Sequence, residues 1–348
     1  MSGLRRRLGR LERRWDTLRG ARRVPTEFRV VTYAGHGSAG RAVVRGRVVD
    51  DPEPAETVAG ESPWAAVRRT ARGFLTTELP GVRLRVEVGG AVTEVVTDAD
   101  GYFRAEVDGA ELVAPWTTGR VVLASAYRGV ERAEAPVRVR VSDGRAELGV
   151  LSDVDDTVLQ TGVQHTWTML RQTLTGSALT RTTFAGAPEL YRALARPDDR
   201  NPVCYVSSSP WNLHDFLLGF LGHRGFPAGP VLLRDLVTGG HKRTRIEELL
   251  DLHPDLRWVL LGDSGEHDPA IYAETVRRHP GRVLAVCIRE VRLDPGDGKV
   301  EAAVAGWDEQ VPFVLAPDSL TMARRLAELG LVTADDVAAV ARPDAAPD

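Results

Sequence analysis

The chain has 348 residues, 43% of them hydrophobic, and a formal net charge of −3. This length suffices for two domains that each bury a core, and the composition is ordinary for a soluble globular protein. No apolar run approaches the roughly 20 residues that span a bilayer, and the N-terminus lacks the apolar stretch of a secretory signal. Cys204 and Cys287 both lie in apolar runs, which excludes a disulfide framework and indicates buried, reduced thiols in a cytoplasmic protein.

Residues 1–24 are predicted to form a basic amphipathic helix. They hold nine arginines against Glu12 and Asp16, a net charge of +7. Five apolar residues recur at helical spacing on one face: Leu4, Leu8, Leu11, Trp15 and Leu18. Such a helix can lie on an anionic membrane surface, or it can pack its apolar stripe against the rest of the protein or a partner. The sequence leaves both interpretations open.

Residues 38–147 are predicted to form a small antiparallel β-sandwich. The segment VRLRVEV at 82–88 has apolar residues at every second position, and so does PVRVRV at 136–141, which precedes an Asp-Gly pair that predicts a hairpin. Residues 51–80 interrupt this pattern with Pro, Glu and Gly, and a short helix is expected within 63–74.

From residue 148 the pattern changes to apolar strands that alternate with helical segments. Five strands are expected, at 148–152, 203–207, 231–235, 258–263 and 282–290. The helical segments between them lie at 187–195, 212–223, 241–253 and 268–279. Apolar strands bounded by helices are buried on both faces, which predicts a mainly parallel sheet in a Rossmann-like α/β domain over 148–332. Residues 333–348 are expected to be a C-terminal tail.

Polar side chains gather at the ends of three of these strands. They are Asp153, Asp155, Asp156 and Thr157 after the first strand, Ser207, Ser208 and Ser209 after the second, and Asp263 with Asp268 after the fourth. Lys242 stands at the start of a predicted helix. In a parallel sheet, ligands bind at the carboxyl ends of the strands, near the point where the strand order reverses. These side chains are therefore expected to share one site.

Taken singly, each of these residues has an ordinary structural explanation. An Asp after a strand caps a helix or forms a turn, and a Lys at a helix start is usually solvated. Carboxylates from two strand ends, however, repel one another unless a cation or a proton offsets their charge. A hard cation such as Mg²⁺ suits oxygen ligands, and Lys242 with a serine hydroxyl can hold phosphate oxygens. The group as a whole predicts phosphoryl transfer through an attacking carboxylate.

Four strings carry a resemblance to a known family. DVDDT, YVSSSPW, HKRTRI and GDSGEHD, in this order, resemble the four motifs of the haloacid dehalogenase superfamily of phosphatases. The longer strings around them, over about 148–332, are similar to the catalytic domain of the fungal actin-patch-associated phosphatidate phosphatases and their bacterial relatives. A β-sandwich before the catalytic domain fits that family as well. The resemblance implies a Rossmann-like haloacid dehalogenase fold.

The resemblance implies separate roles for the acids of the first motif. Asp153 matches the nucleophile that forms an aspartyl-phosphate, and Asp155 matches the general acid that protonates the leaving oxygen and later activates water. Side chains two positions apart on an extended segment share a face, so both can reach one phosphoryl group. Asp156 then points away and is left a structural role. Thr157 is grouped with the phosphate-binding residues and fits a loop-stabilising role near Asp155.

The other motifs supply the phosphate and metal ligands that the resemblance implies. Ser207 matches the phosphate-binding hydroxyl, with Ser208 or Ser209 as alternatives if the alignment slips, and Lys242 matches the phosphate-binding cation. Mg²⁺ is the implied cofactor. Its implied ligands are Asp153, Asp155, Asp263 and Asp268.

The leading hypothesis is a Mg²⁺-dependent phosphatase of a phosphomonoester, and the resemblance implies phosphatidate, cleaved to diacylglycerol and phosphate at a membrane surface. About 25 residues separate the first motif from residue 184, too few for a large cap domain, so an open site is expected. An open site also suits a soluble metabolite, a phosphoprotein or a nucleic-acid end, and a non-catalytic lipid-binding module is the third alternative. Outside its basic N-terminus the chain is acidic, so no nucleic-acid partner is expected. A phospholipid and an anionic membrane surface are the expected partners of a cytoplasmic protein that binds peripherally to the inner face.

Overall fold

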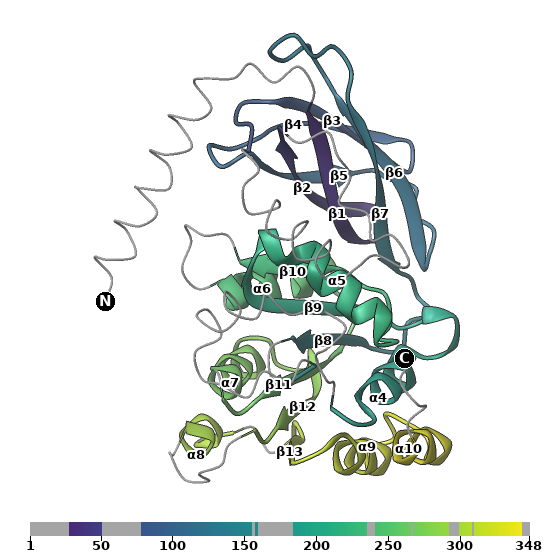
Figure 1. Cartoon of the computed structure of the whole chain (residues 1–348). Helices are drawn as coiled ribbons and strands as arrows, with labels where there is room; N and C mark the ends of the chain where they lie inside the picture. Colours follow the sequence, from purple (N-terminus) through teal and green to yellow (C-terminus); the bar gives the residue numbers. More distant parts are fainter. Residues whose placement is uncertain are drawn as a thin grey trace, which may run out of the picture.

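The computed structural model describes residues 28–50, 78–154, 157–158, 184–234, 241–265, 267–291, 299–307 and 310–342. These residues form a β domain followed by an α/β domain (Figure 1). The helices predicted at 1–24 and within 63–74 lie outside the described residues. No helix among the residues described is long and apolar enough to cross a membrane.

Seven strands form the β domain. They are β1 (Arg29–Ser38), β2 (Arg41–Val49), β3 (Arg83–Val88), β4 (Ala91–Val96), β5 (Tyr102–Asp108), β6 (Trp116–Leu123) and β7 (Glu134–Ser142). Their order in the sheet is β4-β3-β6-β7-β1-β2-β5, and every pairing is antiparallel except that of β1 with β7. The domain therefore starts at Arg29, earlier than the predicted residue 38, because the glycines and His36 in β1 hide its strand pattern.

The β domain buries an aliphatic core inside one curled sheet. Alternate residues of β3 point inward, with Leu84, Val86 and Val88 all buried. Strands β4 and β5 are the two edge strands of the sheet. A short turn at 97–101 nevertheless joins them, and their residues contact one another. The sheet must therefore curl back on itself. The two separate sheets of the predicted sandwich are replaced by one continuous sheet, since β1 pairs with both β2 and β7.

The α/β domain is built on a parallel sheet of six strands. These strands are β8 (Gly149–Asp153), β9 (Val203–Pro210), β10 (Val231–Arg234), β11 (Trp258–Asp263), β12 (Val283–Arg289) and β13 (Phe313–Ala316). Their order is β10-β9-β8-β11-β12-β13, and all neighbours pair in parallel. This confirms the parallel sheet and its five predicted strands. The short strand β13 was not predicted.

Helices cover both faces of this sheet. They are α4 (Ala187–Ala195), α5 (His214–His223), α6 (His241–Leu252), α7 (Asp268–Arg278), α8 (Lys299–Val304), α9 (Ser319–Glu328) and α10 (Ala334–Ala341). One apolar core lies between the sheet and α4, α5, α9 and α10, and a second lies between the sheet and α6 and α7 (Figure 1). The strands read as continuous apolar runs because each face packs against helices.

Two local predictions differ from the structure. Residues 334–341 form helix α10 rather than a tail, because Thr333 and Asp336 make a capping box and Val340 is buried. The turn after Asp143 leads from β7 into β8 of the other sheet, so it connects the two domains and closes no hairpin. Cys204 and Cys287 are buried free thiols, as predicted, and burial raises the pKa of each to about 12.

The β domain packs on the α/β domain beside α5, α6 and β10 (Figure 1). Tyr33 of β1 stacks on Trp211, with ring centroids 4.5 Å apart. Ser142 of β7 lies 2.7 Å, Oγ to Nδ1, from His253, which follows α6. Burial and the nearby groups His36, Arg282 and Arg140 lower the pKa of His253 to about 3. The contact between the domains thus contains an imidazole that is neutral at physiological pH.

We expect this histidine to make the fold acid-sensitive. The unfolded chain binds a proton at His253 near pH 6.5, whereas the folded chain binds it only near pH 3, so stability is full above about 6.5 and falls as the pH drops between these values. Between pH 7 and pH 5 this group should cost about 2 kcal/mol of unfolding free energy. Urea denaturation at both pH values measures the loss, and His253→Gln should reduce it. An equal loss in the variant would contradict the assignment.

Candidate active site

The candidate site lies where the strand order reverses. From the central strand β8 the chain moves first to β9 on one side and later to β11 on the other. Asp153 is the last residue of β8, and Asp263 is the last residue of β11. Because β8 and β11 are parallel neighbours, their carboxyl ends meet at one edge, which is where ligands bind in such sheets.

Three carboxylates predicted from the sequence meet at this edge. Asp153, Asp263 and Asp268 each place one oxygen so that the three atoms lie within 4.8 Å of one another, and all three residues are fully buried. Asp268 begins helix α7, and its Oδ2 accepts a hydrogen bond from the Asp263 backbone amide at 3.3 Å. The fourth motif therefore brings both of its acids to the first motif.

Lys242 reaches the carboxylates from α6, which lies on the same face of the sheet as α7. It lies in the first turn of α6, with a side chain only 5% exposed. Its Nζ is 2.8 Å from Oδ1 of Asp153 and also forms an ion pair with Oδ1 of Asp268. Motifs that are about 90 and 110 residues beyond the first one thus converge on Asp153.

This donor set fits a divalent metal ion. Three carboxylates and one ammonium group give these four buried side chains a formal net charge of −2. Like charges at this separation are costly without a cation, and hard oxygen donors are the ligands that Mg²⁺ takes. Asp153, Asp263 and Asp268 would hold such an ion. Asp155, the fourth predicted ligand and the predicted general acid, lies outside the described residues, as does Asp156.

The second motif ends on the strand next to Asp153. Val206 of β9 is the register partner of Asp153, and Ser207 follows it, fully buried. The Ser207 hydroxyl oxygen accepts a hydrogen bond from the backbone amide of Ser209 at 2.9 Å. Ser208 is half-buried and Ser209 is buried. Which of the three hydroxyls holds phosphate stays a prediction, with Ser207 nearest along the strand to the register position of Asp153.

Thr157 lies in a turn directly after β8. Its side chain is buried, and its hydroxyl makes no hydrogen bond with any residue that the structure describes. The turn is closed by a hydrogen bond from the Val158 amide to the Val154 carbonyl at 3.0 Å. A buried hydroxyl without a partner is costly, so its burial after β8 is consistent with a polar ligand there.

Sequence reasoning missed Gly262, whose lack of a side chain lets Asp268 and Tyr272 of α7 approach strand β11. A Cβ atom at Gly262 would lie 2.4 Å from Oδ2 of Asp268 and 2.8 Å from Cε2 of Tyr272. Tyr272 in turn donates its hydroxyl to the Leu261 carbonyl at 2.8 Å, which ties α7 to β11. The Gly-Asp pair at the end of an apolar strand was the available signal, because glycine there marks a close approach.

A buried arginine ends the neighbouring strand. Arg289 is the register partner of Asp263, and its guanidinium donates to Oγ of Ser319 at 2.9 Å and lies 4.1 Å from the ring centroid of Phe184. Burial lowers its pKa. Its side chain thus contacts the first residue of α9 and Phe184, which lies three residues before α4.

Comparison with known proteins identifies the domain that carries this site. Residues 148–290 match the family model described as the catalytic domain of phosphatidate phosphatase APP1. This segment is an APP1-type catalytic domain. It contains β8 to β12 and all four motifs, so the predicted similarity to the phosphatidate phosphatase catalytic domain is confirmed.

Two curated proteins are similar to part of this chain. The phosphatidate phosphatase APP1 of Saccharomyces cerevisiae is 28% identical over 152 residues, which is 41% of this chain and 26% of the yeast protein. The uncharacterized protein C29B5.04c of Schizosaccharomyces pombe is 28% identical over 217 residues, which is 58% of this chain and 35% of that protein. The chain thus spans about a third or less of the length of either relative.

Solved structures are less similar. A glycosyl hydrolase family 2 member from Bacteroides cellulosilyticus covers 89% of this chain and 41% of its own, with 12% identity and a TM-score of 0.26. A carbohydrate acetylesterase from Xanthomonas citri covers 75% of this chain and 68% of its own, with 12% identity and a TM-score of 0.28. Scores of this size carry no argument about fold or function.

Replacing Gly262 should damage the site through packing. In Gly262→Ala the new methyl group overlaps Asp268 and Tyr272, so the free energy of unfolding should fall by about 1–3 kcal/mol. Gly219→Ala in α5 is the matched control, since a Cβ atom there meets nothing within 4 Å and alanine favours the helix. Urea denaturation of both variants measures the difference. Equal stability of the two variants would contradict the close approach.

Proposed function

We propose that this chain is a Mg²⁺-dependent phosphatase that hydrolyses phosphatidate to diacylglycerol and inorganic phosphate. One observation carries the proposal: Asp153, Asp263, Asp268 and Lys242 converge at the switch point of an APP1-type catalytic domain. The four-motif order and the strand order β10-β9-β8-β11-β12-β13 support assignment to the haloacid dehalogenase superfamily.

The proposed reaction has two steps. A carboxylate oxygen of Asp153 attacks phosphorus, forming an aspartyl-phosphate while the ester P–O bond breaks and Asp155 gives its proton to the leaving alcohol oxygen. Asp155 then takes a proton from water, whose oxygen attacks the phosphorus and releases phosphate as Asp153 is regenerated. Atoms and protons balance over the cycle. The role of Asp155 rests on the resemblance of the first motif.

The remaining residues bind and orient the phosphoryl group. Lys242 lies beside Asp153 and supplies positive charge to the phosphoryl oxygens, while the hydroxyls of Ser207 and Thr157 offer hydrogen bonds. Asp153, Asp263 and Asp268 would hold a Mg²⁺ ion, which would supply further positive charge to the phosphoryl oxygens. Burial of the whole group strengthens each of these electrostatic interactions, since water is excluded.

A lipid substrate is favoured over a soluble one by two observations. The yeast relative carries the name phosphatidate phosphatase, and residues 1–24 combine a net charge of +7 with an apolar stripe suited to an anionic membrane surface. We propose that the enzyme acts in the cytoplasm and binds peripherally to the membrane. A soluble phosphomonoester remains the alternative substrate, and a lipid-binding module without turnover is disfavoured by the intact carboxylate and lysine cluster.

Removal of the nucleophile should abolish turnover. Asp153→Asn keeps the shape but loses nucleophilicity, so phosphate release should fall by at least about 1,000-fold. The assay presents phosphatidate in micelles, lysophosphatidate, sugar phosphates, nucleotides and a phosphopeptide, each with Mg²⁺ and with excess EDTA. Asp251→Asn, on the exposed face of α6, is the control and should stay active. Release from a soluble substrate alone would replace the lipid assignment, and full activity of Asp153→Asn would refute the nucleophile.

Deletion of residues 2–24 should separate membrane binding from catalysis. The shortened chain should bind anionic vesicles more weakly and hydrolyse phosphatidate in them more slowly, because it lacks the basic apolar stripe. Hydrolysis of a soluble substrate should not change. Leu11→Glu with Trp15→Glu, which breaks the stripe but keeps every arginine, should reproduce the deletion in vesicle sedimentation. Unchanged lipid turnover in both variants would refute the membrane anchor.

A further inference from the structure

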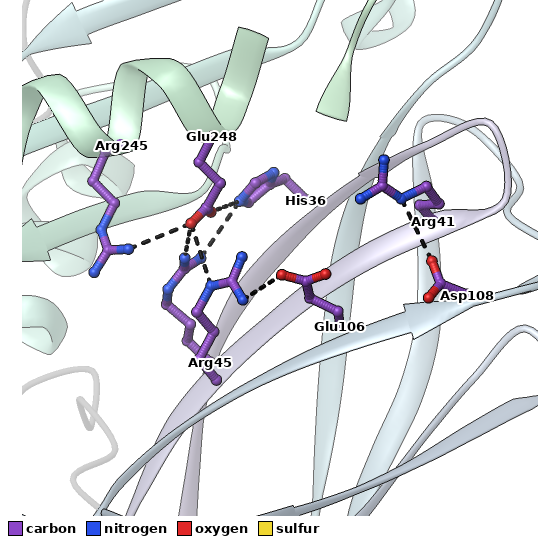
Figure 2. A network of polar contacts seen from close by, with 8 residues as sticks. His36, Arg41, Arg45, Glu106, Asp108, Arg245 and Glu248 are labelled. Carbon is purple, nitrogen blue, oxygen red and sulfur yellow. Dashed lines mark hydrogen bonds and ion pairs between the residues drawn. The ribbon is translucent and has the colours of Figure 1, made fainter. Parts of the chain in front are cut away.

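Glu248 of α6 is the centre of a polar network that joins the two domains (Figure 2). Its carboxylate accepts a hydrogen bond from His36 Nε2 of β1 at 3.0 Å and forms an ion pair with Arg45 of β2. Arg104 of β5 reaches it at 3.3 Å, and Arg245 of the same helix at 3.4 Å. One carboxylate of the catalytic domain is thus held by three strands of the β domain.

The charges make this contact hard to break. Glu248 is 13% exposed, whereas the side chains of Arg45 and Arg245 are 6% and 8% exposed. Burial by itself would raise the pKa of Glu248, but the hydrogen bond from His36 and the charge of Arg45 outweigh it and hold the pKa well below its usual value. Removing the carboxylate would leave buried guanidinium groups facing one another without their shared anion, which is strongly unfavourable.

The helix held in this way is the one that carries Lys242. Lys242 lies in its first turn, six residues before Glu248. The other end of the helix is fixed as well, because Arg282 Nη2 donates to the carbonyls of Leu250 at 3.0 Å and His253 at 2.6 Å. A helix is rigid over such a distance, so the position of Lys242 is set by contacts that Glu248 makes with β1, β2 and β5.

Strand β1 also contacts the element that follows the serine motif. Tyr33 stacks on Trp211, with an interplanar angle of 12°, and lies 4.2 Å from the ring centroid of His214. Trp211 comes directly after the last residue of β9. One strand therefore contacts both elements that bring phosphate-binding groups to Asp153: α6 through His36, and the end of the serine motif through Tyr33.

We propose that the β domain is a working part of the phosphatase site, with Glu248 as the positioning residue through which it places Lys242. This inference rests on the proposed function for the role of Lys242. The β domain is then more than an appended binding module, because its strands position the phosphate-binding lysine of the other domain. Glu248 itself touches neither the substrate nor the reacting atoms.

The test compares two neighbouring glutamates of α6. Glu248→Gln removes the charge that the β domain holds, whereas Glu247→Gln removes an exposed partner of Arg278 on the side of α7. With a soluble phosphomonoester, Glu248→Gln should raise KM and the inhibition constant of inorganic phosphate by about 10- to 100-fold, since Lys242 is displaced. Glu247→Gln should change neither constant. A loss of folded protein alone would lower the apparent kcat and leave both constants unaltered.

A second measurement does not depend on turnover. Acetylation of Lys242 by acetic anhydride, followed by peptide mass spectrometry with and without inorganic phosphate, should be slow in the wild type because the amine is buried in ion pairs, and faster in Glu248→Gln. If the wild type hydrolyses no phosphomonoester, the proposed function fails, and this comparison alone decides the inference. Identical acetylation and kinetic constants in Glu248→Gln and Glu247→Gln would overturn it. If Glu248→Gln does not fold, Arg104→Gln, at a half-exposed position of the same network, takes its place.

Discussion

The burial of three carboxylates within 4.8 Å of one another is the constraint that the rest of this structure meets. Such a cluster is tolerable only with positive charge beside it. Lys242 supplies one charge, and the net charge of −2 that remains matches a divalent cation. Three features bring the acids of the fourth motif to Asp153: the close approach permitted by Gly262 in β11, the hydrogen bond from Tyr272 to the Leu261 carbonyl, and the start of α7 at Asp268.

The helix that carries Lys242 must also be held in position relative to the sheet. This helix packs on the sheet through apolar residues such as Leu249, which fix its distance from the sheet but resist sliding along it only weakly. Directional contacts limit that remaining freedom at both places where they occur: the network at Glu248 and the hydrogen bonds from Arg282 at the end of the helix. Because strands of the β domain contact this helix at Glu248, the β domain contributes to the geometry at Asp153. No residue of the β domain belongs to the carboxylate cluster.

Prediction from sequence succeeded where a pattern was local. The apolar runs at 203–207 and 258–263 became β9 and β11, and the helical spacing at 187–195 became α4. It failed where neighbours in space decide the structure. Strand β1 was not recognised because its glycines pack against other strands, and β13 was missed because a four-residue strand at a sheet edge carries little periodic signal.

The sequence by itself was enough to predict the parallel sheet, the residue types at its strand ends and the APP1-type family. Buried strands appear as short apolar runs and the motifs as short strings in a fixed order, so both can be recognised without the structure. Only the tertiary structure decided that Asp268 shares its oxygens between Lys242 and the Asp263 amide, and that seven strands curl into one sheet. It alone joined His36 to Glu248, 212 residues further along the chain. A spacing in the sequence cannot encode such a contact, because the distance between His36 and Glu248 is determined by the packing of the two domains and not by the chain between them.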